Sequence, residues 1–360
     1  MKQLTVCFLL GISCIILVVG SACNSDTHQP NPVIAVQLPA TGGNIDLLKA
    51  GLEDAAAQVG VALLFASPVN NLKDENTFIE SAIKHKVVAL IITPVASDGS
   101  IPDLIKARQA GITVVCFQSC VAQTGIVQGF VAAPDRDLGK SSGDAILEFS
   151  IGKMNGKAVV GMINCTEEPA CSLRRSGFIS RMSMLPGIKT IDGRDIQPAN
   201  PSQSIVEALL NAHPEIDLLW AADAQSTALA VQAVSARSLA GSIPVFGTGI
   251  DSQTGGLLSA KDGILQGVSV PLDYQAGYDT LYIAKIIVEG KLVPEQVNAP
   301  TTIIRRGETD LLNQYIERKG RIILSNLESS LWNISLPGAT PGTLDCNCIP
   351  EAHPVIPTPP

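Results

Sequence analysis

Aromatic and charged residues are both scarce in this chain of 360 residues. Aromatic side chains make up 4% of the sequence, charged side chains 16%, and only 4 histidines occur. The net charge is −8, and no run of lysine and arginine is longer than two residues. A nucleic-acid partner is therefore excluded, because phosphate binding requires a clustered basic face. Hydrophobic residues make up 46%, which indicates a well-packed globular chain rather than a disordered one.

The N-terminal segment indicates export. Lys2 precedes an apolar stretch from Leu4 to Val19, and the small residues Gly20, Ser21 and Ala22 lead to Cys23. This order is typical of a signal peptide, and a cysteine in that place resembles the bacterial lipobox, in which Cys23 is lipidated. An uncleaved membrane anchor or simple secretion is the alternative, since about 20 apolar residues can span a bilayer. Each version leaves the body of the chain in the periplasm or at the outer face of the cell membrane.

Six of the 9 cysteines lie beyond this segment, as three close pairs: Cys116 with Cys120, Cys165 with Cys171, and Cys346 with Cys348. An even number in close pairs is typical of local disulfides in an oxidising compartment. We therefore expect bonds within the first two pairs. The last pair is too tight for an easy internal bridge and stays unassigned. A metal site is the alternative, but it would require histidines or carboxylates at set spacing, and the histidines lie far away in sequence.

From residue 33 onward, short β-branched runs alternate with amphipathic segments. The predicted strands cover residues 33–38, 62–66, 87–92, 113–117, 126–131, 158–163, 189–196, 218–221, 245–247 and 265–270. The predicted helices cover residues 45–59, 76–85, 101–110, 135–149, 204–212, 226–235, 274–288 and 310–319. Uninterrupted apolar runs fit strands that are covered on both faces, as in a parallel sheet. The alternation predicts α/β architecture with right-handed crossovers.

The number of strands requires two sheets, and the alternation breaks at three places. We predict two doubly wound, Rossmann-like lobes joined by a multi-strand hinge. The predicted parts are a signal peptide and lipobox (1–23), a tether (24–32), an N-terminal lobe (33–132 plus 271–297), a C-terminal lobe (133–270 plus 298–325) and a proline-rich tail (326–360). Such a hinge suits closure about a bound molecule.

Two short motifs resemble those of enzymes, but neither has the flanking sequence that the motif requires. Residues 139–143 read Gly-x-Ser-x-Gly, yet a nucleophile elbow needs a strand-to-helix turn, and this stretch falls inside a predicted helix. Residues 138–141 resemble the end of a phosphate-binding loop, but Pro134 stands where that motif has its first glycine. No carboxylate pair or histidine cluster points to hydrolysis. We therefore expect no catalytic residue, no cofactor and no metal.

Five short motifs, in order along residues 33–304, resemble the type I periplasmic binding protein family and its ribose-binding branch. They are Leu48–Gly51, Ala89–Pro94, Arg174–Phe178, Ala212–Ile216 and Gly249–Asp251. The resemblance implies a monomeric receptor that closes two lobes over a small polar solute such as a sugar. It also implies delivery to an ABC permease in the membrane. The same lobes serve ligand-sensing input proteins for chemoreceptors or sensor kinases, and the sequence does not separate the two roles.

In this family the ligand lies at the carboxyl ends of the parallel strands, where loops and helix N-termini surround a crevice. Carried over position by position, the resemblance places ligand contacts at Asn44, Thr93, Gln118, Arg174, Asp223 and Asp251. Carboxylates accept hydrogen bonds from neighbouring hydroxyls, and a guanidinium donates to them. The aspartates have a second possible role as helix N-caps. The family's sugar-stacking aromatics fall on Asn44, Ile45 and Pro201, so another small polar molecule is an alternative to a sugar.

Overall fold

The first of two sheets is entirely parallel. The computed structural model describes residues 31–39, 45–66, 69–123, 125–165, 168–195 and 201–317. Six strands form this sheet in the order β11-β5-β4-β3-β1-β2: β1 (Val33–Gln37), β2 (Ala62–Phe65), β3 (Ala89–Ile92), β4 (Thr113–Gln118), β5 (Gly129–Ala132) and β11 (Gln296–Asn298). We call this sheet and its helices the N-terminal lobe.

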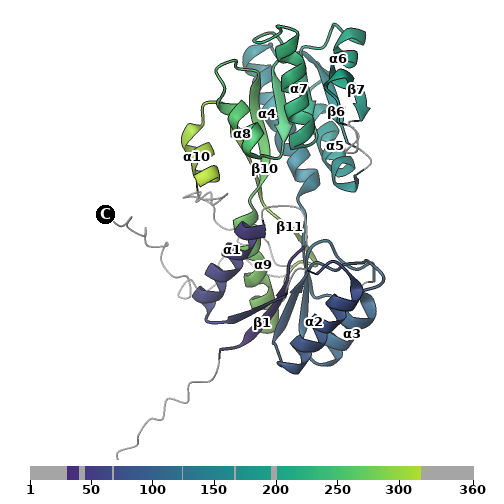
Figure 1. The fold of residues 1–360 in the computed structure, drawn as a ribbon, viewed down its shortest axis with the longest axis vertical. Coiled ribbons are helices and arrows are strands. Elements are labelled where there is room, and N and C mark those ends of the chain that lie inside the picture. Colours follow the sequence, from purple (N-terminus) through teal and green to yellow (C-terminus); the bar gives the residue numbers. More distant parts are fainter. Residues whose placement is uncertain are drawn as a thin grey trace, which may run out of the picture. The chain divides into compact units, whose positions relative to one another are not determined.

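Helices cover both faces of the first sheet. Figure 1 shows α1 (Ile45–Val59) and α9 (Asp273–Val288) on one side, and α2 (Leu72–Lys84) and α3 (Ile101–Gln109) on the other. Ile34 packs in the cluster of α1 and α9, whereas its neighbour Ala35 packs in the cluster of α2 and α3. Successive strand side chains point to opposite faces, so a strand covered on both sides must be apolar throughout.

The second sheet is parallel except at one edge. Its order is β12-β10-β9-β8-β6-β7, and β12 runs antiparallel to β10. Its strands are β6 (Ala158–Asn164), β7 (Ile188–Asp195), β8 (Leu218–Ala221), β9 (Val245–Thr248), β10 (Leu265–Pro271) and β12 (Thr301–Arg305). We call this sheet and its helices the C-terminal lobe.

Two sets of helices enclose the second sheet as well. On one face lie α4 (Asp135–Lys153) and α5 (Pro169–Met182), where the rings of Phe178 and Trp220 stack with centroids 4.1 Å apart. On the other face lie α6 (Gln203–Ala212), α7 (Ala224–Ala236), α8 (Ser252–Ser259) and α10 (Thr309–Glu317). The prediction of two doubly wound parallel-sheet lobes is thereby confirmed.

The chain passes from one sheet to the other three times. These connections follow β5 into α4, β10 into α9, and β11 into β12. The first two each lead directly into a helix that begins with aspartate, Asp135 in α4 and Asp273 in α9. A carboxylate in the first turn of a helix is favoured by the helix dipole.

The sequence did not predict the strands β11 and β12, and it did not delimit the helices α5 and α8, although it offered Asp251 as a possible N-cap. The buried face of α5 contains Cys171, Gly177, Phe178 and Met182, so it presents few large apolar residues at helical spacing. The strands β11 and β12 are short and lie on either side of Pro300 in the sequence, where the sequence predicts a break. Both lie at sheet edges, where the apolar signal of a strand is weakest.

Helices α4 and α5 touch through their backbones. A Cβ atom added to Gly139 would lie 1.9 Å from the carbonyl oxygen of Arg174. One added to Gly177 would lie 1.9 Å from the carbonyl oxygen of Arg136. Each helix therefore presents a glycine to the main chain of the other. No larger residue fits at either position without separating the helices.

The same arrangement occurs in the N-terminal lobe, between α1 and α9. A Cβ atom on Gly51 would lie 2.0 Å from the carbonyl oxygen of Tyr274, and one on Gly277 would lie 2.1 Å from that of Leu48. Gly51 and Gly177 belong to two of the motifs that carry the family resemblance. Their physical role is close helix packing.

Two glycines of α4 give a matched test of this packing. Gly139→Ala is expected to lower the free energy of unfolding by about 1 to 3 kcal/mol, because the helices must move apart. Gly152→Ala is expected to raise it by about 0.5 to 1 kcal/mol, because a Cβ there meets nothing within 4 Å and alanine favours the helix. Guanidinium unfolding followed by circular dichroism measures both. Two stabilising substitutions would contradict the backbone contact.

Candidate ligand-binding site

Thr93 and Gln118 lie together at the carboxyl edge of the first sheet. Thr93 directly follows β3, and Gln118 ends the neighbouring strand β4. The Thr93 hydroxyl donates to the carbonyl oxygen of Phe117 at 2.9 Å, and its amide donates to the carbonyl oxygen of Gln37 at 3.1 Å. Both predicted residues are half-buried. The N-terminal lobe thus has Thr93 and Gln118 at the ends of neighbouring strands.

Gln118 occupies an unusual backbone conformation, with φ at 59°. The amide of Ser119 donates to the carbonyl oxygen of Phe117 at 2.7 Å, which closes a three-residue turn around Gln118. A disulfide joins Cys116 to Cys120 and encloses this turn. The first predicted disulfide is therefore confirmed, and it frames a predicted ligand contact.

Arg174 is oriented by two acceptors. Its Nε donates to Oδ1 of Asp135 at 2.8 Å, and its Nη1 donates to the carbonyl oxygen of Ala222 at 3.2 Å. Asp135 is 8% exposed, and the guanidinium side chain is 22% exposed. The contact with Ala222 places Arg174 beside the loop that carries Asp223. These two predicted residues come from α5 and from the end of β8.

Asp223 caps α7 and lies against the second disulfide. Its Oδ1 accepts from the amide of Ser226 at 2.6 Å. Cys165, directly after β6, is bonded to Cys171 in the first turn of α5, which confirms the second predicted disulfide. The two sulfur atoms and a carboxylate oxygen of Asp223 all lie within 4.8 Å of one another.

Asp251 caps α8 in the next loop of the same edge. Its Oδ1 accepts from the amide of Thr254 at 2.7 Å, and its own amide donates to the Thr254 hydroxyl at 2.8 Å. The strands β6, β8 and β9 are neighbours, so the segments that follow them are neighbours too: helix α5 with Arg174, and the loops with Asp223 and Asp251. The cap role that the sequence offered for both aspartates is confirmed. In each case the cap bonds fall on Oδ1, and Oδ2 accepts none of them.

The structure brings the predicted residues together within each lobe. Thr93 lies with Gln118 in one lobe, and Arg174, Asp223 and Asp251 line one edge of the other. Asn44 lies outside the described residues. The lipidation candidate Cys23, the pair Cys346 and Cys348, and the predicted tail lie outside them as well.

Sequence reasoning missed two buried carboxylates behind these residues. Asp135, described above, holds the guanidinium of Arg174. Glu75 of α2 is fully buried, and its Oε2 accepts from Gln37 Nε2 at 2.9 Å and from the amide of Val95 at 2.8 Å. Gln37 Nε2 also donates to the carbonyl oxygen of Thr93 at 3.2 Å, so this network fixes the turn after β3. Glu75 lies four residues before the buried Ile79 of α2, but the predicted helix begins only at residue 76, so its burial was missed.

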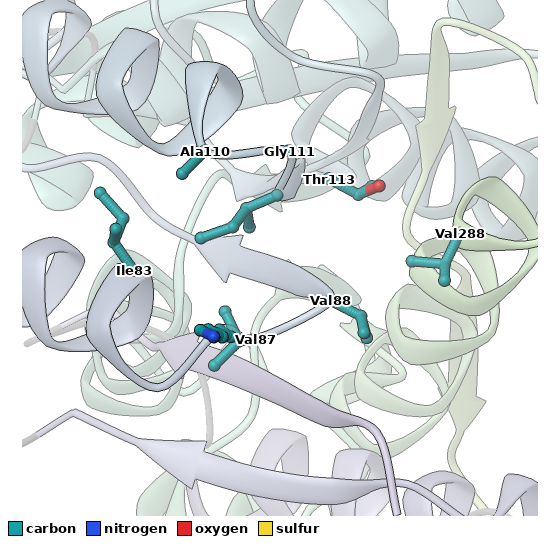
Figure 2. Close-up of a pocket in the computed structure, with 9 residues that line it drawn as sticks. Ile83, Val87, Val88, Ala110, Gly111, Thr113 and Val288 are labelled. Carbon is teal, nitrogen blue, oxygen red and sulfur yellow. The ribbon is translucent and has the colours of Figure 1, made fainter.

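A cavity of about 510 Å³ lies elsewhere in the N-terminal lobe. Figure 2 shows side chains around it from α2, from the turns before β3 and β4, and from α9. Its lining includes Ile83, Val88, Ile112 and Val288, which are aliphatic. These turns precede β3 and β4, whereas Thr93 and Gln118 stand at the other ends of those strands. This cavity is therefore distinct from the predicted ligand edge.

The Gly-x-Ser-x-Gly spelling lies inside α4, as predicted. The motif serine, Ser141, is half-buried, and its hydroxyl shares a hydrogen bond with the hydroxyl of Thr301 at 3.1 Å. This contact links α4 to β12. The serine thus lies inside a helix and not on the strand-to-helix turn that a nucleophile elbow requires.

The chain belongs to the periplasmic binding protein family, because that family's domain model matches residues 34–292. The ABC transporter periplasmic-binding protein YphF of Escherichia coli is 26% identical over 240 residues, covering 65% of this chain and 73% of the relative. The ribose import binding protein RbsB of Bacillus subtilis is 24% identical over 253 residues, covering 70% and 80%. These relatives confirm the resemblance to the ribose-binding branch.

Solved structures share the fold. A periplasmic ribose ABC transporter structure from Conexibacter woesei superposes with a TM-score of 0.67 at 16% identity, covering 81% of this chain and 97% of that one. At this identity the likeness concerns the fold alone. Among the described residues, none of the helices combines the length and the apolar character needed to cross a membrane.

Two ion pairs between α4 and α5 give a matched test of how Arg174 is held. Asp135→Ala is expected to lower the free energy of unfolding by about 2 kcal/mol, because it leaves the largely buried guanidinium of Arg174 without its carboxylate partner. Asp144→Ala removes the more exposed pair with Arg181 and is expected to cost less than about 1 kcal/mol. Urea unfolding measures both. Equal losses would show that Asp135 is no more important than a surface partner.

Proposed function

We propose that this protein is an extracytoplasmic receptor of an ABC-type importer that binds a small polar solute, a sugar or sugar-like molecule, between its two lobes. The lobes are those predicted from the sequence, residues 33–132 with 271–297 and residues 133–270 with 298–325. The protein acts as a monomer, presents its ligand to a membrane permease and catalyses no reaction. The main supporting observation is that Arg174 of α5 and the loop residues Asp223 and Asp251 follow neighbouring strands at one sheet edge, in a member of this family.

The chemistry of that row suits a polyhydroxylated ligand. The guanidinium already has its Nε engaged by Asp135, which leaves its Nη groups facing the loop of Asp223. Each aspartate uses Oδ1 for its helix cap, so Oδ2 is available to a hydroxyl of the ligand. A guanidinium donates to ring and hydroxyl oxygens and a carboxylate accepts from hydroxyls, so this set of groups suits a sugar.

Closure supplies the remaining contacts. In the proposed complex, Thr93, Gln118 and Asn44 of the N-terminal lobe complete the shell around a ligand held by the C-terminal lobe. A ligand shifts an open–closed equilibrium only by contacts that the closed state alone provides. Binding therefore requires polar groups from both lobes, and each lobe has them at its strand edge.

Binding to a panel of pentoses, hexoses, polyols and nucleosides tests this function. At least one compound is expected to raise the melting temperature and to give a measurable Kd by calorimetry. Asp251→Asn is expected to weaken that binding about tenfold or more, because it keeps the helix cap but removes the charge that accepts from a hydroxyl. The melting temperature of the ligand-free variant should stay close to that of the wild type.

Asp217→Asn is the matched control. Asp217 lies at the opposite end of β8 and accepts from the amide of Val159 at 2.8 Å. It should leave the Kd unchanged. A wild-type protein that binds no member of the panel contradicts the proposed receptor function, and equal effects of both variants contradict the proposed site.

We further propose that Cys23 is lipidated and anchors the mature protein at the outer face of the cell membrane. The support is the sequence alone: an apolar stretch, small residues and then cysteine. Stable anchoring needs at least two membrane-binding groups, and a lipidated Cys23 would carry several acyl chains.

Cys23→Ser is expected to move the protein from the membrane fraction to the soluble extracytoplasmic fraction of the producing cells. Cys14→Ser, in the same leader but away from the small residues, is expected to leave the protein in the membrane fraction. Immunoblots of the separated fractions measure the distribution. Wild-type protein in the soluble fraction would contradict lipid anchoring.

A further inference from the structure

Among the residues that the structure describes, each lobe has one disulfide, and each lies at the strand edge that carries the candidate ligand residues. Cys116–Cys120 closes the end of β4, and Cys165–Cys171 joins the end of β6 to the start of α5. We propose that the four cysteines are positioning residues for ligand binding, so that affinity requires both bonds. This inference rests on the proposed function, because it assigns a role at the same site.

In the N-terminal lobe the disulfide fixes the backbone of Gln118. Cys116 is fully buried in β4, between β3 and β5, so it is an immobile anchor. Cys120 returns to it four residues later, and the residue midway has a φ of 59°. Residues other than glycine rarely adopt this region without help from their surroundings. The bond therefore keeps Gln118 in a conformation that an open loop would seldom populate.

In the C-terminal lobe the disulfide fixes the beginning of α5. Cys165 and Cys171 are 2% and 1% exposed. Arg174 follows Cys171 by three residues, so both lie on one face of the helix. The same sulfur atoms lie against the carboxylate of Asp223. One bond therefore positions the guanidinium and supports the neighbouring carboxylate.

Breaking either disulfide should weaken ligand binding more than it destabilises the fold. The stabilisation that a disulfide gives through the unfolded chain increases with loop length, and the bonded cysteines are only 4 and 6 positions apart in sequence. A freed loop, in contrast, must be ordered again each time a ligand binds, and that cost reduces affinity. The two bonds thus differ from those that mainly hold a fold together.

The paired variants Cys116→Ser with Cys120→Ser, and Cys165→Ser with Cys171→Ser, test the proposal. Each pair is expected to raise the Kd for the panel compound that binds the wild type by about tenfold, at a temperature well below melting. Hydrogen exchange of the amides in residues 117–122 or 168–174, respectively, should become faster. The far-UV circular dichroism should not change.

Chemical reduction of the folded wild-type protein provides a second route if a variant does not fold. Cys120 is half-buried, so dithiothreitol should open the first bond before the buried second one, as followed by alkylation and mass spectrometry. The Kd should rise with this step and return on reoxidation. The Cys116→Ser, Cys120→Ser protein is the control, and its Kd should not respond at that stage.

The outcomes separate the two proposals. Variants with a Kd within twofold of the wild type and unchanged exchange overturn the positioning role, even if their melting temperatures fall. A wild type that binds nothing on the panel contradicts the receptor function instead. The positioning role is then judged by hydrogen exchange, and unchanged loop amides in both variants reject it.

Discussion

The backbone contact between paired helices is the constraint on which the binding edges depend. In the C-terminal lobe, Gly139 and Gly177 allow α4 and α5 to approach until their main chains touch. Only at that approach can Asp135, at the start of α4, reach the side chain of Arg174 in α5. The position of a candidate ligand group is therefore set by two glycines that have no polar chemistry of their own.

The N-terminal lobe repeats this construction. In each lobe, the chain that arrives from the other sheet begins a helix with aspartate and has glycine four residues later: Asp135 and Gly139 in α4, Asp273 and Gly277 in α9. Each of these helices packs against the helix that follows the lobe's first strand, α5 or α1. The segment that enters each lobe is thus linked, through a rigid pair of helices, to the sheet edge that carries the candidate ligand residues. Movement of such a connection would be transmitted to that edge as a rigid-body shift.

The sequence was sufficient for most of the sheet framework and for the places of the candidate residues. Buried parallel strands give continuous apolar runs, and polar residues that follow such runs must lie at a strand edge, as Thr93 and Asp223 do. The sequence did not predict the partner of Arg174, because Asp135 lies 39 residues away and the contact exists only after two helices pack. It also did not delimit α5, whose inner face includes glycine and cysteine among its few large apolar residues.

The two roles that the sequence offered for Asp223 and Asp251 are compatible. A carboxylate has two oxygens with separate acceptor directions, and each helix cap uses only one of them. The cap bond removes the rotational freedom of the side chain before any ligand arrives, so less entropy is lost on binding. The amide donor also offsets part of the cost of desolvating the charge when the site closes. Capping is therefore a physical means of pre-orienting the second oxygen, and a residue with this role carries the same sequence signal as an ordinary N-cap.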